Sequence, residues 1–405
     1  STDDERKFNT VTIIVFNTQG LCKVDTTVTL TSGGTQTDNQ YKAVDINVPL
    51  GFHNVYAGIN LTSGDAEKMR ETLKTTSGVT KYVNLGTATA PAIAEIQKLY
   101  ATTGFPMFSA DVKPTNILPT PAGGSTPNKI EIALDRMVAK VTVRKNTTFT
   151  GTALAAAGAT FSSTDLNWSL GNLNGKIYPY GKANNGQDPN YDYTGSLKDA
   201  AGKTYCTQNF VNDFSTAGAY GSWTGLASTV DENGTDVKLR KAKYAPENNS
   251  AQKRKGESTF TVVKAKFAPD SVATFKTGNT APVMDKTIKP TLSGTETFYI
   301  VRSTAVYYFK DKTEADNYKT FLGVSEIKVE EFKGQFCFYH IFMNQGITSR
   351  NNYYDIQLNK FNGLGTPTGE LTDDEIEQTV DNKGLLEVTV SINKWVIVSE
   401  NHDLE

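Results

Sequence analysis

Apolar and polar residues alternate one by one near the C-terminal end of this 405-residue chain. In the stretch LLEVTVSIN, residues 385–393, the apolar positions are Leu386, Val388, Val390 and Ile392. A period of two is typical of a β-strand with one buried face, because successive side chains of a strand point to opposite sides. Chain ends are usually poorly ordered unless they dock onto something. The pattern therefore predicts a terminal strand that needs a partner.

The alternation breaks after Asn393. Residues 395–398, WVIV, would place apolar side chains on both faces, so we expect a second strand segment after a bulge or bend. Trp395 and Ile397 are among its apolar residues. The terminal strand could pair within its own domain or with a neighbouring molecule, and the pattern leaves both possibilities open. The Gly-rich and acidic residues 363–384 that precede the strand predict a long, flexible link.

Strand-like runs fill much of the remaining sequence. They are residues 8–17, 43–61, 130–146, 260–269, 296–309, 325–345 and 352–365. The first run begins at Phe8 and carries Val11, Ile13 and Val15 on one face. The second run would form two strands around a turn at residues 49–51. Many short strands separated by turns are typical of β-sandwiches.

Helical patterns are few and short. We expect helices at residues 65–74, with Asp65 as the N-cap, at 90–100 and at 312–322. A loop rich in Pro and Gly, residues 112–129, precedes a long strand or strand pair that ends near Asn146. The sequence therefore predicts a mainly all-β fold with two domains, an N-terminal β-sandwich over residues 1–146 and a C-terminal β-sandwich over 147–405.

Charge and composition exclude some functions. Lys and Arg number 41 and Asp and Glu number 43, so no basic bias indicates a nucleic-acid partner. No apolar run approaches the ~20 residues that a membrane-spanning helix needs. The opening residues, STDDERK, are not a signal peptide, so we expect either a cytoplasmic protein or an exported one whose leader has been removed.

No catalytic, cofactor or metal site can be assembled from the sequence. The three cysteines and three histidines are scattered, and none lies in a nucleophile motif. Cys337 and His340 are three residues apart, which places them on opposite faces of a strand, so we expect a buried structural cysteine. The Gly-rich stretch GLGTPTG at 363–369 does not have the spacing of a nucleotide-binding loop. We expect that the chain is not an enzyme.

One polar stretch, residues 178–195, could bind a ligand. Its four tyrosines lie among Asn, Asp and Gly residues and are Tyr178, Tyr180, Tyr191 and Tyr193. Aromatic rings beside hydrogen-bonding groups are what a sugar-binding surface needs. The alternative is an insertion whose tyrosines only pack it onto its domain.

Several short motifs form a set in a fixed order along the chain. They are FPMFS (105–109), LDRMVAKVTV (134–143), YAPEN (244–248), VVKAKFAP (262–269) and RNNYYDIQLNKFNGLGTP (350–367), the last followed by an acidic loop and NKWVIV (393–398). Together they resemble the Bacteroidetes fimbrillins of the FimA and Mfa type, and the motifs from residue 350 onward resemble the C-terminal half of that family. The resemblance implies two tandem transthyretin-like Greek-key β-sandwich domains with a few short helices.

The resemblance also implies a function. Such a chain is a major, or shaft, subunit of a cell-surface fimbria and supports adhesion. It is exported as a lipoprotein precursor, attached only transiently to the outer membrane, and an Arg-specific protease then removes a leader that includes the first strand. The groove left open accepts the C-terminal strand of another copy, by donor-strand exchange.

This resemblance assigns roles to particular residues. The donor segment is 384–405, with Leu386, Val388, Val390, Ile392, Trp395 and Ile397. The N-terminal strand beside the acceptor groove contains Phe8, Val11, Ile13 and Val15. The expected partners are other copies in a head-to-tail polymer, anchor and tip subunits, and ligands on host or bacterial surfaces. The alternative function is a tip or accessory adhesin that binds glycan or protein ligands.

Overall fold

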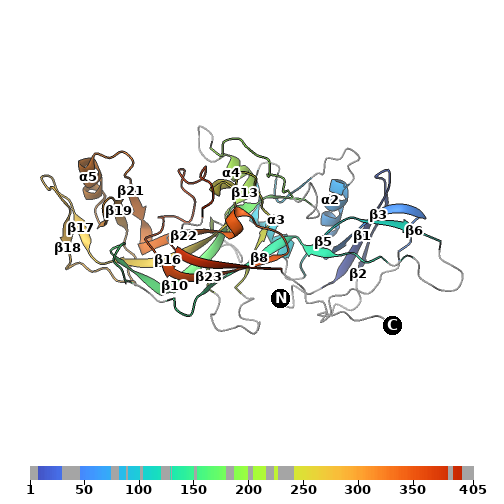
Figure 1. The fold of residues 1–405 in the computed structure, drawn as a ribbon, viewed down its shortest axis with the longest axis horizontal. Coiled ribbons are helices and arrows are strands. Elements are labelled where there is room, and N and C mark those ends of the chain that lie inside the picture. The colour runs from blue at the N-terminus through green and yellow to red at the C-terminus, as the bar shows by residue number, and fades with distance from the viewer. Residues whose placement is uncertain are drawn as a thin grey trace.

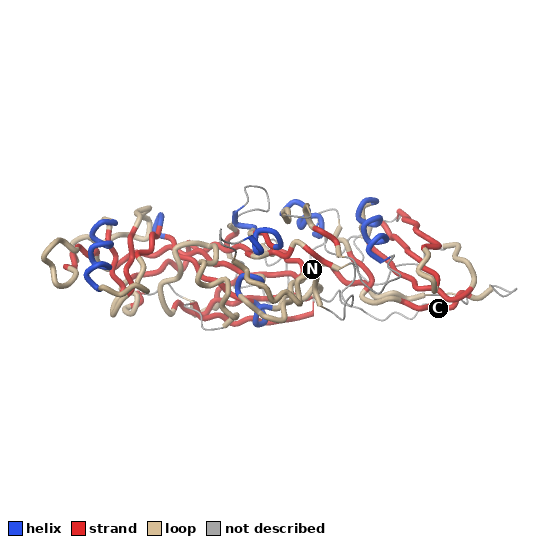
Figure 2. The backbone as a smooth tube through the Cα atoms, turned by 90° about the horizontal axis from the view of Figure 1, so that it is seen from above, coloured by secondary structure: helices blue, strands red, loops and turns tan. Residues whose placement is uncertain are grey.

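A computed structural model of the chain describes residues 8–29, 46–73, 82–87, 90–100, 104–119, 128, 130–149, 153–178, 187–198, 204–215, 223–226, 241–381 and 386–394. The molecule is elongated, with strands along its whole length and a few short helices on them (Figure 1). Seen from above, many strands of its middle part run along the long axis (Figure 2). The prediction of a mainly β fold with few short helices is confirmed.

The N-terminal part is built on one sheet of order β2-β1-β3-β5-β7, with β6 also paired to β3. The strands are β1 (Thr10–Asn17), β2 (Cys22–Thr29), β3 (Gly51–Ile59), β5 (Met107–Ser109), β6 (Lys113–Ile117) and β7 (Leu134–Arg136). Helix α2 (Ser63–Leu73) lies over this sheet (Figure 1) and contributes Ala66 and Met69 to the same core as Phe16 and Tyr56.

The middle part contains two larger sheets. One has the order β15-β8-β23-β24 and comprises β15 (Lys243–Pro246), β8 (Val138–Lys145), β23 (Asn352–Phe361) and β24 (Leu386–Lys394). The other has the order β14-β10-β16-β22, with β9 paired to β10. Its strands are β9 (Ala153–Leu154), β10 (Ala159–Gly171), β14 (Thr224–Gly225), β16 (Phe260–Pro269) and β22 (Phe336–Phe342).

Aromatic side chains join these two sheets. The ring of Phe361, on β23, stacks on that of Phe161, on β10, with centroids 4.8 Å apart, and lies 5.4 Å from that of Tyr339, on β22. Trp168 of β10 is fully buried in the same core. Aromatic residues bury large apolar areas, so this layer stabilises the contact between the sheets.

The third part is a sheet of order β18-β17-β20-β19-β21 at the other end of the molecule from β1 (Figure 1). Its strands are β17 (Val272–Thr274), β18 (Val283–Asp285), β19 (Phe298–Arg302), β20 (Val306–Phe309) and β21 (Val329–Phe332). Helix α5 (Lys312–Leu322) packs Ala315 and Tyr318 against it. The Asp311 carboxylate caps α5 by accepting from the Thr313 amide at 2.7 Å, and Gly323 ends it with φ 65°.

Short elements connect these parts. Two-stranded ladders join β12 (Lys176–Ile177) to β4 (Val83–Asn84) and β11 (Leu173–Asn174) to β13 (Phe210–Val211). The remaining helices in the described ranges are α3 (Ile93–Gln97), α4 (Thr204–Asn209) and the 3-10 turns η1 (Lys98–Tyr100), η3 (Asp213–Ser215), η4 (Lys255–Glu257), η5 (Lys333–Gln335) and η6 (Met343–Gly346). The β12–β4 ladder ties the middle part to the chain that follows α2.

Two local predictions are wrong. Asp65 is not the N-cap of α2: the Thr62 hydroxyl accepts the Asp65 amide at 3.2 Å, so Thr62 is the cap and Asp65 lies in the first turn. The run 43–61 does not form two strands in its described part, because β3 begins only at Gly51 and residues 46–50 have no strand partner there. Leu50, the apolar residue just before β3, is exposed and outside any strand.

The change from the first sheet to the second occurs near Met137. β7 pairs with β5 in the N-terminal sheet, whereas β8 begins at Val138 and pairs with β23 and β15. The predicted division between 1–146 and 147–405 places β8 with the N-terminal strands. Its hydrogen bonds instead join it to the C-terminal ones, and we propose Met137 as the point where one part passes into the other.

Candidate functional site

The terminal strand β24 is docked in its own chain. It runs antiparallel to β23, and in this ladder Leu386 faces Phe361, Val388 faces Leu358 and Val390 faces Ile356. β23 is also paired, in parallel, with β8, so β24 forms the edge of the sheet. Within the described part of the chain no strand pairs with its other side.

The predicted alternation is present in the described side chains of β24. Leu386 is buried, and Val388 and Val390 are half-buried against the main core, whereas Glu387, Thr389 and Ser391 are exposed. The backbone of Ile392 lies in the strand, opposite Tyr354. The predicted donor residues Trp395 and Ile397 lie outside the described residues.

The link before β24 is more firmly held than its sequence suggests. The Arg302 guanidinium donates to the carbonyl oxygens of Leu364 at 2.8 Å and of Gly365 at 2.6 Å. Ile376 is 2% exposed although acidic residues surround it, and the Val380 amide donates to the Lys253 carbonyl at 2.8 Å. The prediction of a long flexible link is therefore wrong up to Asp381, because apolar side chains and backbone hydrogen bonds hold it.

The first strand, β1, is an inner strand of its sheet. β2 pairs with one of its edges and β3 with the other. Of the residues predicted to lie near an acceptor groove, Phe8, Val11 and Val15 are buried and Ile13 is half-buried. Both faces of β1 are therefore largely covered. The exposed edge of the sheet on this side is β2, and none of the described residues forms a strand beside its outer edge.

A polar junction connects β7, β8 and β23. The Asn351 side chain donates to the Asp135 carboxylate at 2.8 Å, and the Asn351 amide donates to the Val138 carbonyl at 3.0 Å. Next to it, the Arg350 guanidinium binds Glu247, with Nε 2.8 Å from a carboxylate oxygen. The motif RNNYY, noticed only as part of a resemblance, thus lies where the first sheet meets the second.

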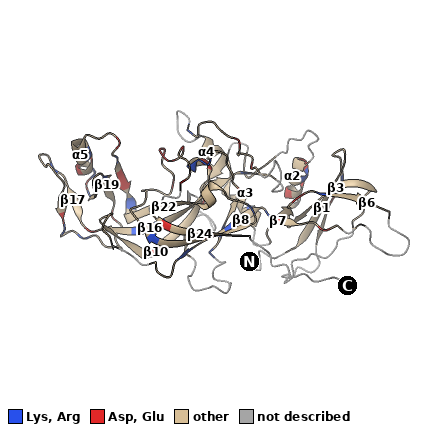
Figure 3. Cartoon of the chain, in the orientation of Figure 1, with Lys and Arg blue, Asp and Glu red and all other residues tan. Residues whose placement is uncertain are grey.

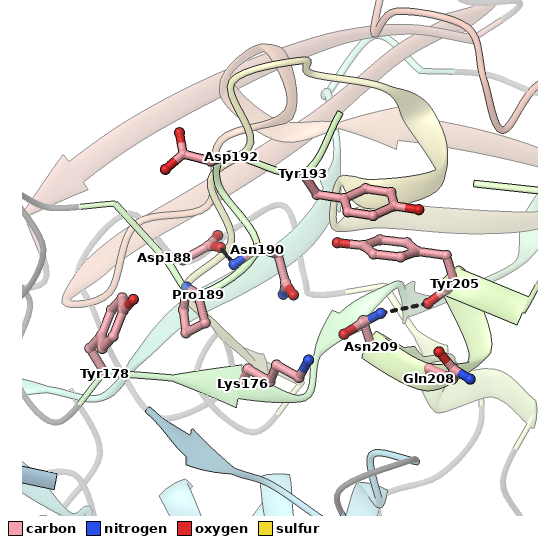
Figure 4. A pocket seen from close by; sticks show the side chains of 10 residues that line it. All are labelled: Lys176, Tyr178, Asp188, Pro189, Asn190, Asp192, Tyr193, Tyr205, Gln208 and Asn209. Atoms are coloured by element: carbon pink, nitrogen blue, oxygen red, sulfur yellow. Dashed lines mark hydrogen bonds between the residues drawn. The ribbon is translucent and has the colours of Figure 1, made fainter. Parts of the chain in front are cut away.

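Two of the four predicted tyrosines line a cavity of about 520 Å³ (Figure 4). These are Tyr178 and Tyr193, while Tyr191 is half-buried outside the lining and Tyr180 lies outside the described residues. Tyr205, from α4, was not predicted, although its ring stacks on that of Tyr193. No local pattern in the sequence could have joined residues of two separate segments.

The structure shows no arrangement for catalysis at the cysteine that the sequence singled out. Cys337 is fully buried, and His340 is on the opposite face of β22, as predicted from their spacing. Burial raises the pKa of the Cys337 thiol to about 12, so it stays protonated and unreactive. Among the described residues no group of His, Cys, Asp and Glu could hold a metal ion.

Charges are mixed along the molecule, with Lys and Arg interspersed among Asp and Glu in the described parts (Figure 3). The ion pairs Lys312–Asp316 and Lys328–Asp374 are exposed, and such pairs contribute little to stability. None of the helices in the described ranges is both long and apolar enough to cross a membrane.

Comparison with known proteins gives one family match. Residues 330–401, from β21 through β24, match the family described as major fimbrial subunit protein type IV, fimbrillin, C-terminal. No curated protein sequence matches the chain.

Several solved structures are similar. A putative cell adhesion protein of Parabacteroides distasonis is 14% identical, with 98% of this chain and 95% of that chain covered and a TM-score of 0.48. A fimbrilin (FimA) of Porphyromonas gingivalis is 15% identical, with 99% and 95% covered and a TM-score of 0.46. The C-terminally truncated tip fimbrial protein Mfa3 of Porphyromonas gingivalis is 12% identical, with 97% of each chain covered and a TM-score of 0.35.

The matched segment contains both strands of the terminal ladder and the motif at the junction. This C-terminal segment, residues 330–401, thus matches the fimbrillin C-terminal family, as the motifs in its sequence predicted.

Proposed function

We propose that this chain is a structural subunit of a cell-surface fimbria and that β24 joins one subunit to the next. The observation that carries the proposal is that the fimbrillin match includes β24, a strand attached to its own sheet by one edge only. The chain is not an enzyme, because the matched family is one of fimbrial subunits. Adhesion is the biological outcome that we infer for the assembled fimbria.

The docking of β24 suits exchange between subunits. An edge strand has one row of backbone hydrogen bonds instead of two, and two of its apolar side chains, Val388 and Val390, are only half-buried. Its release would break the ladder with β23 and uncover Ile356 and Leu358. An equivalent ladder and apolar groove in another subunit would offset both losses. Since the link is held through Val380, only the chain after Asp381 needs to move.

The outer edge of β2 is the acceptor that we propose. β2 is mostly exposed and, within the described chain, is paired only with β1. An unpaired strand edge is a template for another strand. The buried residues Phe8, Val11 and Val15 with half-buried Ile13 would form the base of that region. We infer that an N-terminal leader covers this edge in a lipoprotein precursor until an Arg-specific protease removes it.

The combination of a donor strand, β24, with an acceptor edge, on β2, favours the role of a shaft subunit. A subunit with a donor strand and an acceptor edge can be extended in both directions, which gives a head-to-tail polymer of this chain capped by tip and anchor subunits. A tip or accessory adhesin is the second candidate. The cavity beside Tyr178 and Tyr193 favours it, because a ligand site is what an adhesin needs.

Substitutions on the two faces of β24 test the strand exchange. In an export-competent precursor, we expect Val388→Asp with Val390→Asp to abolish surface fibres in electron micrographs, because these side chains point to the apolar side. The matched control, Thr389→Asp with Ser391→Asp on the exposed side, should leave fibres unchanged. Deletion of the chain from residue 385 onward should also abolish them. Normal fibres after that deletion would contradict the proposal.

A further inference from the structure

A cavity of about 520 Å³ opens in the middle part of the molecule (Figure 4), and none of its lining residues lies on β24. Small-molecule sites usually occupy about 300–1,000 Å³. Tyr178 stands at one end of this cavity and the pair Tyr193 and Tyr205 at the other, with Asn190 and Lys176 between them. The cavity is therefore large enough for a ligand and has aromatic groups at both ends.

The aromatic pair is held in place by its neighbours. The rings of Tyr193 and Tyr205 lie 3.7 Å apart, centroid to centroid, at an interplanar angle of 15°. The Tyr193 hydroxyl donates to the Ser196 carbonyl at 2.8 Å, and the Arg254 guanidinium lies over the Tyr193 ring at 5.7 Å. Arg254 is itself paired with the buried Glu257 at 2.8 Å. A binding surface supported in this way loses little freedom when a ligand arrives.

Side-chain amides supply several of the polar groups that line the cavity. The Asn190 Nδ2 donates to Asn174 Oδ1 at 2.9 Å, and the Asn209 Nδ2 donates to the Tyr205 carbonyl at 2.8 Å. Neither Asn190 Oδ1 nor Asn209 Oδ1 accepts a hydrogen bond from any described residue. Gln208 is exposed on α4 and lines the cavity as well. Amides that can both donate and accept match hydroxyl groups, which also do both.

A cation, Lys176, and two carboxyl groups, Asp188 and the exposed Asp192, also line the cavity. Lys176 is half-buried, and its ammonium lies 5.3 Å from the ring centre of Tyr82. No described residue accepts a hydrogen bond from this ammonium. The buried Asp188 carboxylate accepts from the amides of Asn190, at 2.6 Å, and Asn249, which fixes the turn that carries Asn190. Burial raises the pKa of Asp188 to about 7, so near neutral pH much of this carboxyl is uncharged. The lining thus favours a hydroxyl-rich ligand over a strongly charged one.

We propose that this cavity binds a saccharide of one or two hexopyranose rings. The apolar face of a sugar ring packs on an aromatic ring, here Tyr178 or Tyr205, while its hydroxyls exchange hydrogen bonds with Asn190, Asn209 and Gln208. The ammonium of Lys176 donates to a ring or hydroxyl oxygen. The site lies within a single subunit, so it is independent of fibre assembly and of the proposed strand exchange.

Binding to the purified monomer tests this site. Saturation-transfer NMR and titration calorimetry would be run with glucose, galactose, mannose, N-acetylglucosamine, maltose, lactose and cellobiose. We expect at least one of these sugars to bind. Gln208→Ala should weaken that sugar about three- to tenfold, which is the effect of losing one neutral hydrogen-bonding group. Gln208→Trp should abolish binding by filling the cavity from its exposed side.

A distant tyrosine provides the matched control. Tyr307, on β20, is half-buried like Tyr205, and its ring lies 5.2 Å from that of Tyr318. Tyr205→Leu should reduce sugar binding, whereas Tyr307→Leu should not, with folding checked by circular dichroism. The proposal is overturned if no sugar of the panel binds, if only a peptide probe such as tri-tyrosine binds, or if sugar binding survives Gln208→Trp unchanged.

Discussion

Val390 of β24 lies directly opposite Ile356 of β23, and Ile356 in turn lies beside Val143 of β8. These residues form an apolar row across three strands of one sheet. Ile356 and Val143 are fully buried, whereas Val390, at the edge, is half-buried. The apolar row is therefore least buried at its outer end, where the terminal strand docks.

Locking β24 to β23 should prevent the proposed exchange. Gln357 and Thr389 are register partners in this ladder, and opposed residues of antiparallel strands have the Cα separation that a disulfide needs. We expect the double variant Gln357→Cys, Thr389→Cys to fold and to be exported, but to form no fibres until a reductant releases the strand. Electron microscopy before and after reduction measures the effect.

The lock needs two controls. Cys22 is half-buried, so the experiment belongs in a Cys22→Ser background, while Cys206 and Cys337 are buried. A second lock, Thr274→Cys with Val283→Cys, joins register partners on β17 and β18 at the far end of the molecule. Its oxidation should not affect assembly. If the oxidised and the reduced Gln357→Cys, Thr389→Cys variant polymerise equally, β24 remains paired with β23 of its own subunit in the fibre.

Leu386 should contribute most to the docking of β24, since it is 4% exposed and lies in the main core. Leu386→Ala should lower the free energy of unfolding by about 2–5 kcal/mol, near the lower figure because an edge strand can relax around the gap. Ser391→Ala, on the exposed face, should change it by less than about 0.5 kcal/mol. Urea denaturation of both variants decides this, and equal effects would mean that Leu386 is not anchored as described.

Local sequence patterns predicted individual strands better than they predicted which strands pair with each other. The alternation at 385–393 is visible in the sequence because a half-buried strand requires it, and the Cys337 and His340 faces followed from the same period. The parallel pairing of β8 with β23, more than 200 residues apart, carries no local signal. For the same reason the sequence could not show that Tyr205 stacks on Tyr193. The link was misjudged because its acidic composition hid the buried Ile376.

The backbone of Asn351 at the β7–β23 junction should tolerate few residues. Its φ is 58°, in the left-handed region that asparagine and glycine adopt most readily. Asn351→Ala would combine the backbone cost with loss of the bond to Asp135, about 2–4 kcal/mol in all. Asn351→Gly keeps the conformation and should lose only the side-chain hydrogen bonds, to the Asp135 carboxylate and from Arg136 at 3.5 Å, about 1 kcal/mol. Thermal or urea unfolding separates the two, and equal losses would refute the backbone contribution.

The ion pair of Glu257 with Arg254 should matter for stability because it is buried. The side chain of Glu257 is 0% exposed and that of Arg254 is 12% exposed. Glu257→Ala leaves the guanidinium without its nearest carboxylate and should lower the free energy of unfolding by about 3–5 kcal/mol. The matched control is Asp316→Ala, which removes the exposed pair with Lys312 and should cost less than about 0.5 kcal/mol. A similar effect of the two variants in urea titrations would contradict this assignment.

Asp188 should make stability fall as the pH rises from about 4 to about 7. Its pKa is raised from 3.8 to about 7, chiefly by burial and also by the nearby carboxylates of Glu247 and Glu257, although the hydrogen bonds from the amides of Asn249 and Asn190 lower it. The folded chain therefore holds a proton that the unfolded chain has already lost, and this favours folding less and less as the pH approaches 7. Asp188→Asn should flatten that part of the curve of unfolding free energy against pH.

His340 has the opposite effect on the pH dependence of stability, so its contribution must be measured together with that of Asp188. Burial lowers the pKa of its imidazole, so the unfolded chain binds the extra proton more readily and stability rises as the pH increases toward about 6.5. The informative quantity is the difference between the wild type and Asp188→Asn at each pH, with His340→Gln as the control that removes the opposing contribution. If Asp188→Asn leaves the pH dependence unchanged in both backgrounds, the carboxyl of Asp188 is already charged in the folded chain, and the uncharged Asp188 that we infer for the cavity lining is wrong.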